Sequence, residues 1–148
     1  MSRSAKPQAL LNERLRSRGW RITPQRRAVA EALSGPDLHL TAEEILARAR
    51  RIIPEISRAT VYNTLRELVE MGELDEVQIS PGPSQYDPNA LLHHHHLVCS
   101  TCGRIYDIHP RGIEHVRLGP EEESGVEVER VEIIIHGRCA SCAESDDA

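Results

Sequence analysis

The sequence predicts an α+β protein built from two modules of different chemistry. Apolar residues recur at helical spacing as far as residue 70, whereas the period-two alternation of strands appears only after it. Seven of the eight histidines and all four cysteines lie after residue 92. With 148 residues, the chain has the size of one ordinary domain or of two small ones.

The pattern of the first module predicts three helices before residue 57, each with a recognisable start or end. The apolar repeat at 9–15 predicts the first helix, which Gly19 ends. Thr23–Pro24 begins the second, because threonine is a good N-cap and proline is favoured at the first helical position. Thr41 and Glu44 have the spacing of a capping box, which predicts the start of a third helix.

A fourth helix and a hairpin complete this module. Ser57 is a favourable N-cap, and Gly72 lies where the apolar stripe of that helix ends. Residues 74–79 alternate as a half-buried strand does, residues 80–84 are typical of a turn, and residues 85–87 would form the returning strand. Helices followed by a hairpin are the outline of a winged helix-turn-helix.

The fourth predicted helix carries polar residues that could read a nucleic acid. Val61 and Leu65 would face the core, and the polar side chains fall away from that stripe. Such side chains can reach phosphates and base edges in a major groove, although a solvated helix face is the commoner explanation for any single helix. The basic N-terminal segment and the hairpin favour the nucleic-acid interpretation. The candidate contacts are Arg26, Arg58, Thr60, Tyr62 and Asn63.

The net charge of −5 argues at first against a nucleic-acid partner, but the charge is unevenly distributed. Residues 1–80 carry a net charge of +2, and residues 81–148 carry −7. The first 30 residues hold eight basic side chains and one acidic side chain. The acidic total is therefore an average over two modules, of which the first has a basic end that suits phosphate contacts.

Composition also excludes several classes of protein. No stretch approaches the roughly 18 apolar residues that a membrane helix needs. Only 3% of the residues are aromatic and none is phenylalanine, which argues against an RNA-binding sheet that stacks bases. The first residues lead into no apolar segment, so we expect a cytoplasmic protein with no membrane partner.

Two C-x-x-C pairs, 36 residues apart, have the spacing of a tetrahedral structural zinc site. Two redox-active dithiols or two disulfides are the alternatives, and disulfides are uncommon in the cytoplasm. Residues 103–108 and 126–135, between the pairs, have the pattern of strands. The candidate zinc ligands are Cys99, Cys102, Cys139 and Cys142.

Four consecutive histidines, His93 to His96, precede the first cysteine pair. On a strand, His94 and His96 would point to one face and His93 and His95 to the other, so at most one pair per face could hold a given metal. Imidazole together with carboxylate suits divalent iron, manganese, nickel or zinc, and a solvated histidine run is the alternative. Further candidate ligands are His39, Asp87 and Asp107.

The order of these features resembles the ferric-uptake-regulator (Fur) family of metal-dependent bacterial repressors. The resemblance runs from about residue 11 to residue 142. It implies a winged-helix DNA-binding domain at 1–86, a hinge at 87–92 and an α/β dimerisation and metal-sensing domain at 93–148. It also implies structural zinc on the four cysteines. The motifs that carry it are Arg21–Arg26, His39–Glu44, Ala59–Tyr62, the histidine run before Leu97–Cys99, and the two C-x-x-C pairs.

The resemblance further implies a regulatory metal held between the two domains. An ion there would fix the angle between the DNA-binding domains of a homodimer, and so would select the state that binds a palindromic operator. The late-strand position that supplies a further ligand in the family is Val131 here. A second set that could hold a metal is His93, His95 and Glu114. The implied regulatory ligands are His39, Asp87, His94, His96 and Asp107.

Three residues favour the peroxide-sensing branch of the family. Iron regulators usually carry Glu at the position of Asp87 and Arg at that of Asn63, and Asp107 adds a second carboxylate. Such a site would hold Fe(II) or Mn(II), and peroxide would oxidise His39 or His94 on the iron form. An iron-, nickel- or zinc-uptake regulator of the same family is the alternative. A metalloenzyme is the alternative from another class; without an H-E-x-x-H motif we expect no enzyme.

Overall fold

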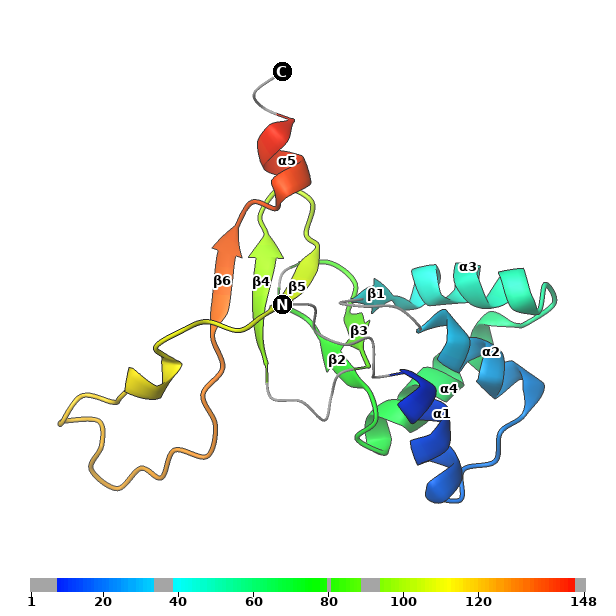
Figure 1. The fold of residues 1–148 in the computed structure, drawn as a ribbon, viewed down its shortest axis with the longest axis horizontal. Coiled ribbons are helices and arrows are strands. Elements are labelled where there is room, and N and C mark those ends of the chain that lie inside the picture. Colours follow the sequence, from blue (N-terminus) through cyan, green and yellow to red (C-terminus); the bar gives the residue numbers. More distant parts are fainter. Residues whose placement is uncertain (1–7, 34–38, 80, 89–93, 146–148) are drawn as a thin grey trace. The chain divides into compact units, whose positions relative to one another are not determined.

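The computed structural model describes residues 8–33, 39–79, 81–88 and 94–145. The chain forms two compact units, residues 1–93 and residues 94–148, here called unit 1 and unit 2. Most of the hinge predicted at 87–92 lies outside the described residues. Unit 1 combines helices with a small sheet, and unit 2 contains a second sheet, which confirms the predicted α+β class (Figure 1).

The described residues of unit 1 form four helices and one antiparallel three-stranded sheet of order β1-β3-β2 (Figure 1). The short strand β1 was not predicted, because two residues show no periodicity. The helices are α1 Gln8–Ser17, α2 Pro24–Ala32, α3 Ala42–Ile52 and α4 Arg58–Glu70. The strands are β1 Leu40–Thr41, β2 Asp75–Val77 and β3 Gln85–Asp87.

The predicted helix starts at Thr23, Thr41 and Ser57 are confirmed. The hydroxyl of Thr23 accepts a hydrogen bond from the backbone N–H of Arg26 at 3.2 Å. Thr41 and Glu44 form both bonds of the capping box, and Ser57 caps α4. These side chains satisfy backbone donors that a helix start leaves without a partner.

Helix α4 is anchored on a core of aliphatic side chains. Leu65 is fully buried, and Leu15, Val29 and Ile45 from the other three helices belong to the same apolar cluster. Burial of one such side chain contributes about 1.5–3 kcal/mol. Because one stripe of α4 is fixed in this way, its opposite, polar face is held toward solvent.

A buried carboxylate ties α1 to the residues that follow α4. Glu73 accepts a hydrogen bond from Nε of Arg14 at 2.8 Å and another from Arg18 at 3.0 Å. Burial of Glu73 favours its neutral form, but the two guanidinium groups outweigh it and lower the pKa of the carboxyl below its usual 4.5. Glu73 is therefore held as a carboxylate that fixes α1 on unit 1.

Unit 2 is a three-stranded sheet of order β5-β4-β6, in which β4 pairs antiparallel with β5 and parallel with β6 (Figure 1). A 3-10 helix η1, Ile113–His115, lies between β5 and β6, and helix α5, Ala140–Glu144, follows β6. No helix in the described part of the chain is long and apolar enough to cross a membrane. The strands are β4 His95–Cys99, β5 Ile105–Ile108 and β6 Ile134–Gly137.

Two strand predictions in unit 2 were too long. The strand expected over 126–135 begins only at Ile134, because its pairing with β4 starts opposite His96. The alternating pattern of residues 126–133 is typical of a strand, but a strand also needs a neighbour. The strand expected over 103–108 begins at Ile105, because Gly103 turns with a φ of 72°.

Candidate metal centres and nucleic-acid interface

The four cysteines of unit 2 form one cluster. Their Sγ atoms all lie within 4.8 Å of one another, and those of Cys102 and Cys139 are 3.9 Å apart. A disulfide would need about 2.05 Å, whereas thiolates about 2.3 Å from one tetrahedral zinc lie about 3.8 Å apart. The cluster therefore has the spacing of a four-thiolate zinc site and not that of two disulfides.

Local turns place the cysteines and prepare Cys99 as a thiolate. The backbone N–H groups of Cys139 and Cys102 donate to the Sγ of Cys99 at 3.4 and 3.5 Å. These hydrogen bonds, that of Cys139 first, lower the pKa of the Cys99 thiol to about 5. Hydrogen bonding with the neighbouring thiols, that of Cys139 above all, raises the pKa of Cys142 to about 12. Because thiolates are the form that binds zinc, an ion here would be bound with release of protons.

The second ligand group of unit 2 lies at the other end of β4. The Nε2 of His94 is 3.4 Å and the Nε2 of His96 is 3.9 Å from the same oxygen, Oδ1 of Asp107. The two imidazole rings pack edge to face with their centroids 4.9 Å apart. Asp107 is directly opposite His96 in the β4–β5 register. The alternation of a strand thus brings two of the four consecutive histidines together, as their positions predict.

Unit 1 contributes one further imidazole–carboxylate pair. The Nε2 of His39 is 3.3 Å from Oδ2 of Asp87, and both side chains are fully buried. His39 directly precedes β1 and Asp87 ends β3, and the pairing of Leu40 with Tyr86 brings the two residues together. The pair therefore depends on a strand that the sequence pattern did not reveal.

His95 and Glu114, which belong to the possible second metal set, each contact another residue. The Nδ1 of His95 accepts a hydrogen bond from the backbone N–H of Ile133 at 3.1 Å. Glu114 lies on η1, where its carboxylate is 3.4 Å from the exposed imidazole of His115. His93 lies outside the described residues. Within the described ranges, no group of metal-ligand side chains includes His95 or Glu114.

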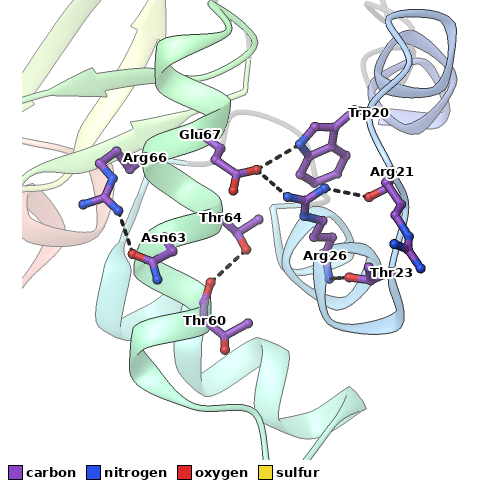
Figure 2. A network of polar contacts seen from close by, with 9 residues as sticks. All are labelled: Trp20, Arg21, Thr23, Arg26, Thr60, Asn63, Thr64, Arg66 and Glu67. Atoms are coloured by element: carbon purple, nitrogen blue, oxygen red, sulfur yellow. Dashed lines mark hydrogen bonds and ion pairs between the residues drawn. The ribbon is translucent and has the colours of Figure 1, made fainter.

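The polar face of α4 is exposed, and several of its side chains are held in place. Tyr62 donates its hydroxyl to Glu43 of α3 at 2.9 Å, and the guanidinium of Arg58 pairs with the same carboxylate. Asn63 accepts a hydrogen bond from Arg66 at 2.8 Å (Figure 2). Thr60 is partly exposed and lies in the first turn of α4, where its backbone N–H donates to the hydroxyl of Ser57 at 3.1 Å. Glu43 could not be predicted as their partner, because it lies on another helix, 15 residues before Arg58.

Arg26 joins α2 to α4 (Figure 2). Its guanidinium donates to Glu67 at 2.8 Å and to the carbonyl of Arg21 at 2.9 Å, and it lies over the ring of Trp20 at 4.5 Å. The indole N–H of Trp20 donates to the same Glu67 carboxylate at 3.1 Å. Arg26 thus has a structural role between the helices, and its phosphate contact stays a prediction.

Comparison with known proteins identifies the family. The model of the ferric uptake regulator family matches residues 17–136. The chain is 34% identical to the peroxide operon regulator of Bacillus subtilis over 91% of this chain and 92% of that protein. It is 31% identical to a ferric uptake regulation protein of Synechococcus elongatus, over 93% of this chain and 95% of the relative. A solved zinc-bound manganese uptake regulator superposes with a TM-score of 0.73 at 27% identity, over 87% of this chain and 98% of that one. The chain therefore belongs to the ferric uptake regulator family.

Proposed function

We propose that this protein is a metal-dependent transcriptional repressor that binds a palindromic operator as a homodimer. The observation that carries the proposal is a helical unit with an exposed polar helix in the same chain as two groups of metal-ligand side chains. The relatives named above are regulators of peroxide response or metal uptake. Such a repressor would act in the cytoplasm, and it would not be an enzyme.

Five side chains would hold the regulatory metal. Nitrogen and oxygen ligands about 2.1 Å from one ion lie about 3 Å apart, close to the 3.3–3.9 Å separations found within unit 1 and within unit 2. Three imidazoles and two carboxylates, with no thiolate, suit Fe(II) or Mn(II), and Ni(II) or Zn(II) can use the same ligands. The proposed ligands are His39 and Asp87 from unit 1 with His94, His96 and Asp107 from unit 2.

The four cysteines would hold a separate zinc ion with a structural role. Their Sγ spacing fits a tetrahedral thiolate site, and all four positions would be taken by protein ligands. A closed site of this kind leaves no position for a substrate. Zinc would therefore stabilise unit 2 and leave the sensing of metal to the histidine and aspartate ligands.

Metal binding would select one arrangement of the DNA-binding units. Because the proposed regulatory ligands come from both units, one ion held by all of them would restrict how unit 1 is oriented. Two recognition helices of a dimer must match major grooves about 34 Å apart to bind both half-sites. The ion would thereby raise the population of the DNA-competent state. The exposed residues of α4, which include Arg58, Tyr62 and Asn63, would contact the operator.

Within the family, we propose that the protein senses peroxide. The support is the pair of carboxylates, Asp87 and Asp107, and the identity of Asn63 on α4. Bound Fe(II) would supply the redox chemistry with hydrogen peroxide. The O–O bond would break, one oxygen atom would be added to a ring carbon of His39 or His94, and the other would leave as water. An oxidised imidazole is a poorer ligand, so the metal would leave and DNA would be released. A metal-uptake regulator would respond to its metal and not to peroxide.

The proposal is tested by selecting operators from a pool of randomised duplex DNA with Mn(II) present. We expect palindromic sequences to be enriched with Mn(II), and we expect a chelator that spares the zinc to prevent the enrichment. On the Fe(II) form, peroxide should release the selected duplex, and mass spectrometry should find one added oxygen on His39 or His94. DNA binding that is the same with and without metal would contradict the proposed metal-dependent repressor. A protein that responds to metal but carries no added oxygen after peroxide treatment would contradict peroxide sensing.

A further inference from the structure

The two ring nitrogens of His96 face different groups. Nε2 is 3.9 Å from Oδ1 of Asp107, another proposed ligand of the regulatory metal in unit 2. Nδ1 is 3.2 Å from Oε1 of Glu132. The His96 side chain is 4% exposed, whereas that of Glu132 is 40% exposed. The half-exposed carboxylate of Glu132 thus contacts Nδ1 of the buried His96 imidazole. Nδ1 is the ring nitrogen that would not bind the proposed metal.

The strand pairing that begins at His96 fixes this contact. The backbone N–H of His96 donates to the carbonyl of Ile133 at 3.1 Å, and the N–H of Ile133 donates to Nδ1 of His95 at 3.1 Å. Both bonds hold the residue next to Glu132. The other carboxylate oxygen of Glu132 is 3.7 Å from the guanidinium of Arg130, which leaves Oε1 directed to His96. Backbone hydrogen bonds of the neighbouring residue and an ion pair with Arg130 thus accompany the contact of Glu132 with His96.

A neutral imidazole carries one proton, which is on either Nδ1 or Nε2. A carboxylate accepts hydrogen bonds and donates none when ionised, so Glu132 favours the tautomer with the proton on Nδ1. The lone pair of Nε2 is then available to a metal. The same contact fixes the orientation of the imidazole ring, as carboxylate partners of metal-bound histidines do.

We propose that Glu132 is a positioning residue that fixes the tautomer and orientation of His96 for the regulatory metal. The inference deepens the proposed function and rests on it. Neither the predicted ligand set nor the expected late-strand ligand position, Val131, includes Glu132. Glu132 acts through His96 and is not itself a ligand of the ion. It would keep the His96 proton on Nδ1, so that Nε2 can bind the metal.

The test compares Glu132→Ala and Glu132→Gln with the wild type, each loaded with zinc at the cysteines and free of regulatory metal. Glu129→Ala is the matched control, because Glu129 is an exposed glutamate of the same segment. Nitrogen NMR of the imidazoles should show the His96 proton on Nδ1 in the wild type and a loss of this preference in Glu132→Ala. Mn(II) affinity should fall about 10–100-fold in Glu132→Ala.

The Glu132→Gln variant distinguishes a positioning role of Glu132 from a purely structural one. Its amide oxygen still accepts the Nδ1–H bond, so Glu132→Gln should recover most of the Mn(II) affinity, and Glu129→Ala should match the wild type. Zinc content should be equal in all four proteins. The positioning role of Glu132 would be overturned, and the regulatory site left intact, by either of two results. One is a Glu132→Ala protein that binds Mn(II) as tightly as the wild type, and the other is a His96 proton on Nε2 in the wild type. A wild type that binds no Mn(II) would overturn the regulatory site and this inference together.

Discussion

Replacing Asp87 by asparagine is expected to abolish Mn(II)-dependent DNA binding and to leave the zinc content unchanged. Asp87 is fully buried, and its Oδ2 lies 3.3 Å from His39. Asparagine has nearly the same shape but lacks the negative charge that strengthens the binding of a divalent ion. Because even outer-shell partners of a metal contribute about 10–100-fold to affinity, loss of a direct ligand should cost at least about 100-fold. Fluorescence anisotropy of the selected duplex, titrated with Mn(II), measures the effect.

Asp75→Asn is the matched control for this substitution. Asp75 lies on β2 directly opposite Asp87 in the register, but it is not among the proposed ligands. The control should keep its Mn(II) response. An Asp87→Asn protein that responds to Mn(II) like the wild type would place the regulatory metal elsewhere. Loss of helical circular dichroism in that variant would instead assign Asp87 to the stability of unit 1.

Replacing Cys139 by serine is expected to remove the zinc and to unfold unit 2. Among the described residues of unit 2, only Val98, Cys99 and Ile105 are buried hydrophobic side chains. A sheet with so small a core depends on its metal, as small zinc modules do. Zinc should fall from about one ion per chain to near zero, as atomic emission would show.

Ser141→Ala is the control for the cysteine variant, because Ser141 lies between Cys139 and Cys142 on the chain. It should retain zinc and the wild-type unfolding temperature. A Cys139→Ser protein that loses zinc and yet unfolds at the wild-type temperature would show that the metal does not stabilise the fold. The cysteines would then be better explained as redox-active dithiols.

The local features of the fold could be predicted because each depends on a few neighbouring residues. Thr23, Thr41 and Ser57 begin helices through hydrogen bonds that reach only three residues ahead. Gly72 ends α4 with a φ of 72°, which glycine adopts without strain. Strand ends were predicted less well. The extent of β6 depends on where β4 begins, and this information is distant in the sequence.

For the candidate sites too, the features that depend on neighbouring residues could be predicted, and those that depend on strand pairing could not. The shared face of His94 and His96 could be derived from strand alternation, and the C-x-x-C spacing predicted the thiol cluster. The pair of His39 and Asp87 could not be derived from local pattern, because it depends on the pairing of β1 with β3. It came from resemblance to a family. Neither pattern nor resemblance indicated Glu132, whose contact with His96 depends on the parallel pairing of β4 and β6.

The coupling between metal and DNA is tested most directly by measuring Mn(II) affinity with and without the selected duplex. If one ion at the histidine and aspartate ligands selects the DNA-competent state, DNA must raise the affinity for Mn(II) by the same factor by which Mn(II) raises the affinity for DNA. We expect both factors to be equal and within about 5–150-fold. An Mn(II) dissociation constant that is the same with and without saturating duplex would contradict the coupling.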